Sequence, residues 1–210
     1  MSNINLCYTY DMNKFDRLLS FVNFLNEYRN VLRIQTVPGQ ERRENDVEHS
    51  YIFAMYAWYI CELYKINLDV NKILKYCLVH DLVEVYAGDT GFWASDEEKE
   101  NKKVREHNSF LKIKEIFSDF PELFELIENY ENKNDGEARF VYALDKTIDV
   151  MEIYIEKGKC WKELVPEATF EKHLEKKRDK IKDVEPAREI NEEIHRRILE
   201  EGVDKFFNLK

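Results

Sequence analysis

Apolar residues recur at intervals of three and four positions along most of the chain, and this spacing constrains the fold more than any other feature. Such a period places side chains on one face of a helix, whereas a strand alternates at every second residue. Only 6 glycines and 4 prolines interrupt the 210 residues. The sequence therefore predicts an all-α fold.

Turn and capping residues divide this pattern into helices. The expected helices cover about residues 13–32, 47–64, 69–86, 95–117, a shorter one from Pro121, 135–157, and two charged segments after Pro166 and Pro186. One apolar stripe marks the first of them: Phe15, Leu18, Leu19, Val22, Leu25 and Tyr28. The two charged segments have the composition of solvated outer helices.

Charge and hydropathy exclude several classes of protein. A net charge of −10 argues against a nucleic-acid-binding surface, which depends on clustered lysine and arginine. The sequence has neither a basic and apolar leader nor an apolar run of the roughly 18–20 residues that a membrane span needs. We therefore expect a cytoplasmic protein. The cysteines have no paired metal spacing, so we expect reduced, structural thiols at Cys7, Cys61, Cys77 and Cys160.

One helical segment carries ionisable residues where the pattern demands apolar ones. Residues 77–89 read CLVHDLVEVYAGD, and the helix from 73 to 86 is apolar on nearly all sides. His80, Asp81 and Glu84 cannot all reach water there. Because an unpaired buried charge costs several kcal/mol, such groups need a hydrogen-bonded partner or a metal ion.

Two other helices place similar groups among core positions. Asp145 lies within the stripe of the 135–157 helix, and His49 begins an equally apolar helix. Taken singly, each residue is more often a satisfied core histidine, a cap or an ion-pair member. Together, His49, His80, Asp81 and Asp145 offer two nitrogens and two carboxylates. That set suits one divalent cation such as Zn, Mn, Co or Mg.

The blocks around these residues resemble a known family. The order His49, then His80-Asp81, then Asp145 is similar to the H…HD…D pattern of HD-domain metal-dependent phosphohydrolases, which are helical bundles with the metal between buried helices. The segments ENDVEHS, HDLVEVYAGDT and EARFVYALDK resemble the 5′-deoxynucleotidase branch of that family. The resemblance predicts an HD domain over residues 13–160, followed by a charged helical extension over 161–210.

The resemblance also implies roles for individual residues. His49, His80, Asp81 and Asp145 match metal ligands, and Glu84 matches the general acid/base. Asp89 matches a residue that contacts the nucleotide sugar. Arg33 corresponds to a substrate-binding arginine, with Arg42 and Arg43 as alternatives for that role. The branch further implies a homodimer.

The resemblance implies hydrolysis of deoxyribonucleoside 5′-monophosphates, and the chemistry of these residues fits hydrolysis of a phosphomonoester. A bound cation acidifies water and neutralises phosphoryl oxygens, and Glu84 is placed to move the proton. Other HD enzymes act on deoxynucleoside triphosphates, guanosine polyphosphates or cyclic dinucleotides, and some bind two metals. A second metal would need more histidines, and only His107 lies even remotely near in sequence. A non-catalytic module with a structural metal is the alternative outside enzymes.

Overall fold

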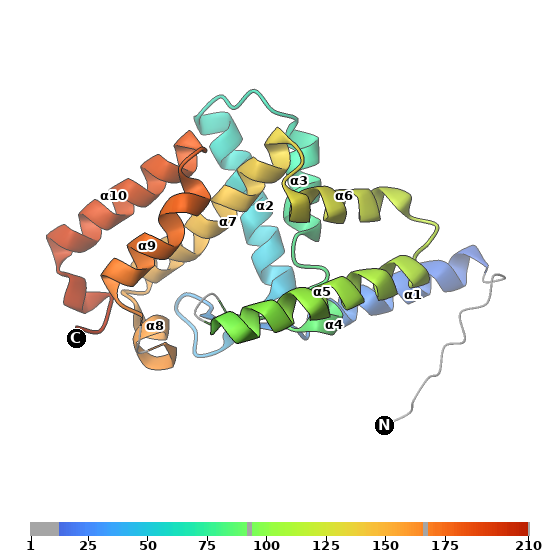
Figure 1. Cartoon of the computed structure of the whole chain (residues 1–210), viewed down its shortest axis with the longest axis horizontal. Coiled ribbons are helices and arrows are strands. Elements are labelled where there is room, and N and C mark those ends of the chain that lie inside the picture. Colours follow the sequence, from blue (N-terminus) through green and yellow to red (C-terminus); the bar gives the residue numbers. More distant parts are fainter. Residues whose placement is uncertain (1–12, 92–93, 166–167, 210) are drawn as a thin grey trace.

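The computed structural model describes residues 13–91, 94–165 and 168–209. It confirms the all-α fold (Figure 1). The helices are α1 (Lys14–Tyr28), α2 (Asp46–Leu63), α3 (Val70–Val79), α4 (Glu84–Ala87), α5 (Asp96–Ile116), α6 (Pro121–Asn132), α7 (Gly136–Ile155), α8 (Lys159–Leu164), α9 (Phe170–Ile181) and α10 (Glu185–Glu201). A short 3₁₀ helix spans Val203–Lys205.

Three helix starts follow the sequence prediction. Ser95 and Glu98 form a reciprocal capping box at the start of α5, and the Asp135 side chain accepts a hydrogen bond from the Ala138 amide at the start of α7. Pro121 begins α6, where its missing amide proton has no cost. The short helix α8 was not predicted.

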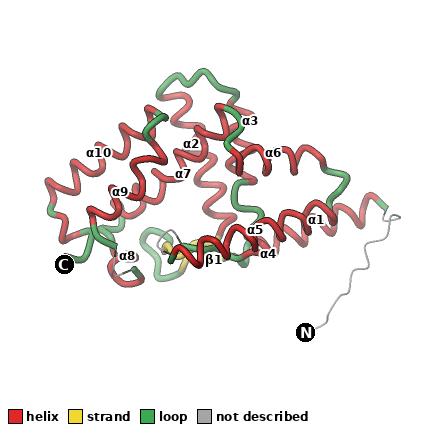
Figure 2. The backbone as a smooth tube through the Cα atoms, in the orientation of Figure 1, coloured by secondary structure: helices red, strands yellow, loops and turns green. Residues whose placement is uncertain are grey.

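A small antiparallel hairpin also escaped the sequence analysis. Strands β1 (Leu32–Thr36) and β2 (Arg43–Asn45) flank the turn at Pro38-Gly39, and Gly39 has a positive φ of 77° (Figure 2). The Arg43 guanidinium donates to the backbone oxygens of Leu32 and Arg33 across the hairpin. In β1, Leu32 and Ile34 alternate with polar residues, but a run this short beside a three-residue partner did not distinguish strands from a loop.

The buried face of α1 differs from the predicted stripe. The helix buries Phe24 and Tyr28, whereas Phe15, Leu18 and Leu19 are exposed. Phe24 packs against Phe117, which follows α5. The choice between the two apolar faces depended on tertiary neighbours, which the helical period alone does not specify.

Two hydrophobic clusters form the core, and α7 contributes to both. The first cluster is formed mainly by residues of the segment that runs from α1 through α7. The second is formed by the end of α7 together with α8, α9, α10 and Phe207. Figure 1 shows α7 running between α2 on one side and α9 on the other. The two C-terminal helices are therefore not wholly solvated: they bury His173, Lys177 and His195.

The described cysteines agree with the expected structural thiols. Cys61, Cys77 and Cys160 are free and buried, while Cys7 lies outside the described residues. Within the described ranges, no helix combines the length and apolar character that a bilayer crossing requires.

Candidate metal centre

The first turn of α2 places His49 in the interior. Asn45 caps this helix and forms a reciprocal capping box with Glu48, which fixes the direction in which the helix enters the core. His49 is buried, and its Nδ1 lies 3.6 Å from Oε2 of Glu44 at the end of the hairpin. A carboxylate on one ring nitrogen orients the other nitrogen for ligation.

The His80-Asp81 pair lies in a tight turn between α3 and α4, and this corrects the single helix predicted over 69–86. The Leu82, Glu84 and Val85 amides each bond to the carbonyl three residues earlier. In such a turn, side chains three positions apart lie one above the other. Asp81 and Glu84 consequently project to the same side, as one turn of α-helix would also allow.

The ring of His80 is held by its own backbone. Its Nδ1 lies 2.9 Å from the carbonyl oxygen of Cys77, one turn earlier. Because a carbonyl only accepts, Nδ1 donates this hydrogen bond, which leaves Nε2 as the ring nitrogen that faces the cluster. That Nε2 lies 3.0 Å from Oδ2 of Asp81.

Asp145 approaches both histidines from α7. Its Oδ1 lies 3.5 Å from Nε2 of His49 and 3.9 Å from Nε2 of His80. One ligand atom from each of His49, His80 and Asp81 also lies within 4.8 Å of the others. Ligand atoms around a tetrahedral ion with bonds of about 2.1 Å stand roughly 3.4 Å apart. The observed spacings therefore fit a divalent cation after small side-chain adjustments.

Two unsatisfied nitrogens support this assignment. Among the described residues, Nε2 of His49 and Nε2 of His80 are buried and make no hydrogen bond. Buried polar atoms are nearly always satisfied, so two orphaned nitrogens that face the same carboxylate indicate a missing positively charged partner. Imidazole nitrogen with carboxylate oxygen is a donor set for Zn, Mn or Co.

The electrostatics of the cluster favour a positive charge at this point. Burial and Arg33 lower the pKa of His49, but contacts with Asp145 and Glu44 outweigh them and raise it to about 9. Burial raises the pKa of Asp145, but Lys146, His49 and His80 bring it well below its ordinary value. A cation would replace the proton on His49 and keep both carboxylates ionised.

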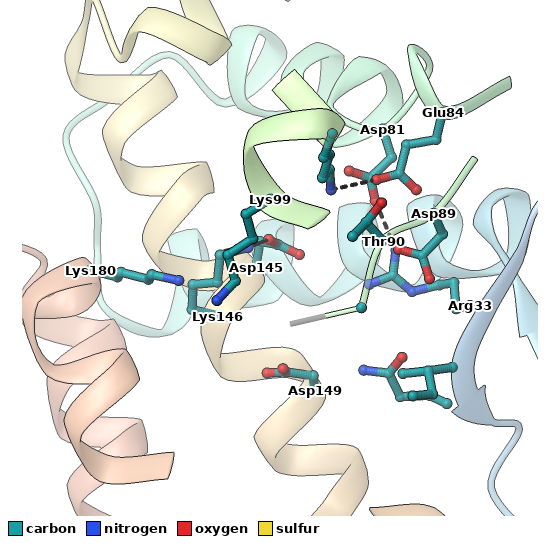
Figure 3. Close-up of a pocket in the computed structure, with 14 residues that line it drawn as sticks. Arg33, Asp81, Glu84, Asp89, Thr90, Lys99, Asp145, Lys146, Asp149 and Lys180 are labelled. Atoms are coloured by element: carbon teal, nitrogen blue, oxygen red, sulfur yellow. Dashed lines mark hydrogen bonds and ion pairs between the residues drawn. The ribbon is translucent and has the colours of Figure 1, made fainter. Parts of the chain in front are cut away.

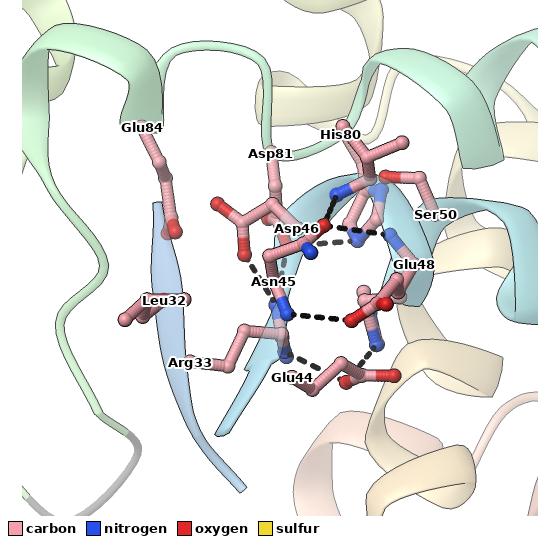
Figure 4. A network of polar contacts seen from close by, with 12 residues as sticks. Leu32, Arg33, Glu44, Asn45, Asp46, Glu48, Ser50, His80, Asp81 and Glu84 are labelled. Carbon is pink, nitrogen blue, oxygen red and sulfur yellow. Dashed lines mark hydrogen bonds and ion pairs between the residues drawn. The ribbon is translucent and has the colours of Figure 1, made fainter. Parts of the chain in front are cut away.

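Arg33 joins the centre to a set of acids on the hairpin and α2. Its Nη1 lies 2.8 Å from Oδ2 of Asp81 and 3.4 Å from Oδ1 of Asp46 (Figure 4). Its Nε lies 3.7 Å from Glu44. Burial, then the charge of Asp81, raises the pKa of Asp46 to about 7. Arg33 therefore balances part of the negative charge behind the metal ligands.

Glu84 lies beside the cluster. Its side chain is buried, and Oε1 lies 3.0 Å from Nζ of Lys102 on α5. Ligand atoms of Asp46, Asp81 and Glu84 come within 4.8 Å of one another. Burial, followed by the charge of Asp81, raises the pKa of Glu84 well above its ordinary value, and Lys102 opposes this.

These groups line one cleft of about 230 Å³ (Figure 3). Asp81, Glu84 and Asp145 lie along it with Arg33, and Asp89 and Thr90 come from the loop after α4. Arg105 of α5 holds that loop, because its guanidinium donates to the Ala87 carbonyl and the Thr90 hydroxyl. The predicted site residues Arg33, Asp81, Glu84, Asp89 and Asp145 therefore line the same cleft, and His49 and His80 lie against Asp145.

The alternative residues lie elsewhere. Arg42 is exposed and forms a two-pronged ion pair with Glu48, and Arg43 is committed to the hairpin backbone. His107 is an exposed residue of α5 that lines a different pocket. Of the three arginines considered, Arg33 alone lines the cleft.

Glu44, Asp46, Lys102 and Lys146 were missed by the sequence analysis although they contact the cluster. The first two lie in the ENDVEHS block, and their closeness to His49 was a usable signal. Lys102 belongs to a helix whose charges look uniformly solvated, so only the tertiary packing of α4 on α5 identifies it.

Comparison with known proteins indicates one protein family. A family model described as HD domain matches residues 25–189. The 5'-deoxynucleotidase HDDC2 of Homo sapiens is 31% identical over 132 residues, which is 61% of this chain and 63% of that protein. The Dictyostelium discoideum HDDC2 is 32% identical over 124 residues, 55% of this chain and 64% of that protein. The chain thus spans less than two thirds of the length of these relatives.

Solved structures extend the similarity to the fold. The crystal structure of a predicted metal-dependent phosphohydrolase from Magnetospirillum magnetotacticum MS-1 is 26% identical, with a TM-score of 0.72 over 88% of this chain and 94% of that one. A protein from Pyrococcus horikoshii OT3 is 23% identical, with a TM-score of 0.59 over 86% of this chain and 97% of that one. The second likeness concerns the fold alone.

Proposed function

Because the chain belongs to the HD-domain family, we propose that it is a metal-dependent 5′-nucleotidase that hydrolyses deoxyribonucleoside 5′-monophosphates. One observation carries the proposal: two orphaned imidazole nitrogens and two carboxylates converge from α2, α7 and the turn after α3 at the wall of a cleft. The relatives named 5'-deoxynucleotidase support the choice of substrate.

In this proposal His49, His80, Asp81 and Asp145 hold one divalent cation. When bound, such an ion acidifies its water and neutralises charge on the phosphoryl oxygens. The protein orients two of these four ligands by other contacts: Glu44 orients His49, and the Cys77 carbonyl orients His80. This prior arrangement reduces the reorganisation that metal binding would otherwise need.

Glu84 is the proposed proton carrier. Its carboxylate is close to Asp81 but projects from the next turn of the chain, so it reaches the cleft beside the ligands. Loss of phosphate from a nucleoside monophosphate requires a proton on the departing 5′ oxygen, and the raised pKa of Glu84 favours the protonated form that donates it. Lys102 fixes the orientation of the Glu84 side chain.

Arg33 and Asp89 are the proposed substrate-binding residues. Arg33 presents its guanidinium to the cleft while it stays paired with Asp81, which keeps the long side chain in one orientation. Asp89 follows Gly88, whose φ of 75° turns the chain toward the cleft. A carboxylate there is able to accept hydrogen bonds from sugar hydroxyls.

A substrate panel tests this function. The metal-loaded protein is incubated with deoxynucleoside 5′-monophosphates, the matching ribonucleotides, 3′-monophosphates, 5′-triphosphates and guanosine polyphosphates, and released phosphate and pyrophosphate are measured. We expect phosphate release to be fastest from the deoxynucleoside 5′-monophosphates. Faster hydrolysis of triphosphates or guanosine polyphosphates would assign another HD activity, and no hydrolysis with bound metal would favour the non-catalytic module.

A further inference from the structure

Lysines from three helices gather on one side of the cleft. Lys99 of α5, Lys146 of α7 and Lys180 of α9 line it near Asp145, whereas Glu84, Asp89 and Arg33 lie on the other side (Figure 3). Lys180 belongs to the region predicted from the sequence as a solvated extension. The cleft is therefore completed by a C-terminal helix.

These lysines are close enough to repel one another. Burial, followed by the charges of Lys146, Lys177 and Lys99, lowers the pKa of Lys180 to about 8. Part of this charge is balanced internally, because Lys146 pairs with Asp145 and Lys177 pairs with Asp149. Holding several ammonium groups together in a partly buried cleft costs free energy, and a bound anion offsets that cost.

The charge of the whole cleft matches a particular anion. Among its described lining residues, five are acidic and five are basic. The acids are Asp81, Glu84, Asp89, Asp145 and Asp149, and the bases are Arg33, Lys99, Lys102, Lys146 and Lys180. With these side chains ionised the lining is neutral, so a divalent cation gives the cleft a net positive charge, and a proton on Glu84 adds to it. A phosphomonoester dianion offsets that charge.

We propose that Lys99, Lys146 and Lys180 form an anion subsite that binds the phosphoryl oxygens of the substrate, so that α9 is part of the active site. The inference extends the proposed function and rests on it for the identity of the phosphorylated substrate. Binding of the phosphoryl group itself does not require turnover.

The geometry at Asp145 lets one phosphoryl group reach both the metal ligands and the lysines. Oδ1 of Asp145 faces the two histidines, and its Oδ2 accepts a hydrogen bond from Lys146. The Asp145 carboxylate therefore lies between Lys146 and the proposed metal position. A tetrahedral phosphate carries three non-bridging oxygens and is able to contact groups on both sides.

Phosphate binding by the metal-loaded protein tests the subsite. Calorimetric titration with inorganic phosphate is compared for wild type, Lys180→Gln, Lys99→Gln and the control Lys172→Gln. Lys172 is an exposed lysine of the same helix α9 that does not line the cleft. Loss of one charged hydrogen bond weakens binding by about tenfold or more. We expect that loss for Lys180→Gln and Lys99→Gln, with wild-type affinity for Lys172→Gln.

Further measurements separate a binding role from a structural one. Metal content should match wild type in the Lys180→Gln protein, because Lys180 is not among the proposed metal ligands, and the unfolding temperature should not fall, because the substitution removes one of the mutually repelling ammonium groups. In the nucleotidase assay its KM for a deoxynucleoside monophosphate should rise while kcat changes less. Affinity for the unphosphorylated deoxynucleoside should stay the same.

Wild-type phosphate affinity in both Lys180→Gln and Lys99→Gln would overturn the subsite. An equal loss for Lys172→Gln would also overturn it, since the effect would then be general charge attraction. If no nucleotide is hydrolysed but phosphate binding still falls in the two cleft variants, the proposed function fails and the anion subsite stands.

Discussion

At the scale of single residues, the two histidines of the centre are oriented by different partners. His80 depends on a backbone carbonyl one turn earlier, whereas His49 depends on the side chain of Glu44. A backbone carbonyl is kept when the side chain of its residue is substituted, whereas a side-chain carboxylate is lost. Glu44 is therefore a supporting residue that the HD pattern does not include.

Removal of Asp145 tests the ligand set. In Asp145→Ala, the carboxylate that faces both Nε2 atoms is lost, so we expect purified protein to retain little divalent metal. Added metal should then raise the unfolding temperature less than in wild type, because binding to the folded state is what stabilises it. Metal analysis by mass spectrometry and thermal scans measure both effects.

A matched control is Glu137→Ala, which removes a carboxylate from the first turn of the same helix, outside the cleft. This variant should keep its metal. Stoichiometric metal in Asp145→Ala would remove Asp145 from the ligand set.

Glu84→Gln separates metal binding from proton transfer. Glutamine keeps the size of the side chain but cannot carry the proton, so turnover should fall by roughly 10²–10⁴-fold while metal content stays near wild type. Glu106→Gln is the control, since Glu106 also pairs with Lys102, at 3.2 Å, but does not line the cleft. Single-turnover rates on metal-loaded protein decide the question. Near wild-type turnover in Glu84→Gln would transfer the proton role to another group.

At the scale of elements, the break between α3 and α4 shows what local sequence leaves undetermined. Residues 69–86 carry no glycine or proline, and the apolar pattern continues across His80 and Asp81. The chain tightens there because amides bond three residues back, and Ser109 of α5 donates to the Val83 carbonyl. Helix α5 is distant in the sequence. The helical period therefore predicted a helical segment here but not the turn that interrupts it.

A buried ion pair attaches α9 to α7. The ammonium of Lys177 is fully buried, donates to the Lys146 carbonyl at 2.6 Å and pairs with the Asp149 carboxylate. In Lys177→Met, Asp149 is left as an unpaired buried charge, and the free energy of unfolding should fall by about 3–5 kcal/mol. Urea unfolding measures the change.

The double variant Lys177→Met with Asp149→Leu should recover much of that loss, because it removes both charges. The exposed α9 residue Lys172 provides the control substitution Lys172→Met, which should change the free energy of unfolding little. A Lys177→Met protein as stable as wild type would show that this ion pair does not attach α9.

At the scale of the whole molecule, the sequence predicted the helical architecture and the convergence of four side chains better than their surroundings. Helical period and the HD pattern are local properties, and His49, His80, Asp81 and Asp145 all meet in space. The hairpin and the contribution of α9 depend on contacts between distant segments. The division into 13–160 and 161–210 stays a prediction, and the family model extends across it to residue 189.

Self-association is a prediction at the same scale. Large apolar side chains are exposed on α1 and α2, among them Phe15, Val22, Trp58 and Tyr59. Monomers seldom expose extended apolar faces, so these agree with the homodimer that the family resemblance implies. Light scattering should give twice the 25.4 kDa of one chain. A mass of one chain at all micromolar concentrations would contradict the homodimer.

The central claim is that one divalent ion, held by His49, His80, Asp81 and Asp145, makes this chain a nucleotidase. Metal-free protein is prepared with a chelator and titrated with Mn, Co or Zn while phosphate release from a deoxynucleoside 5′-monophosphate is followed. We predict no release without metal and full activity at one equivalent per chain. Undiminished activity in the metal-free protein, or activity that requires two equivalents, would contradict the claim.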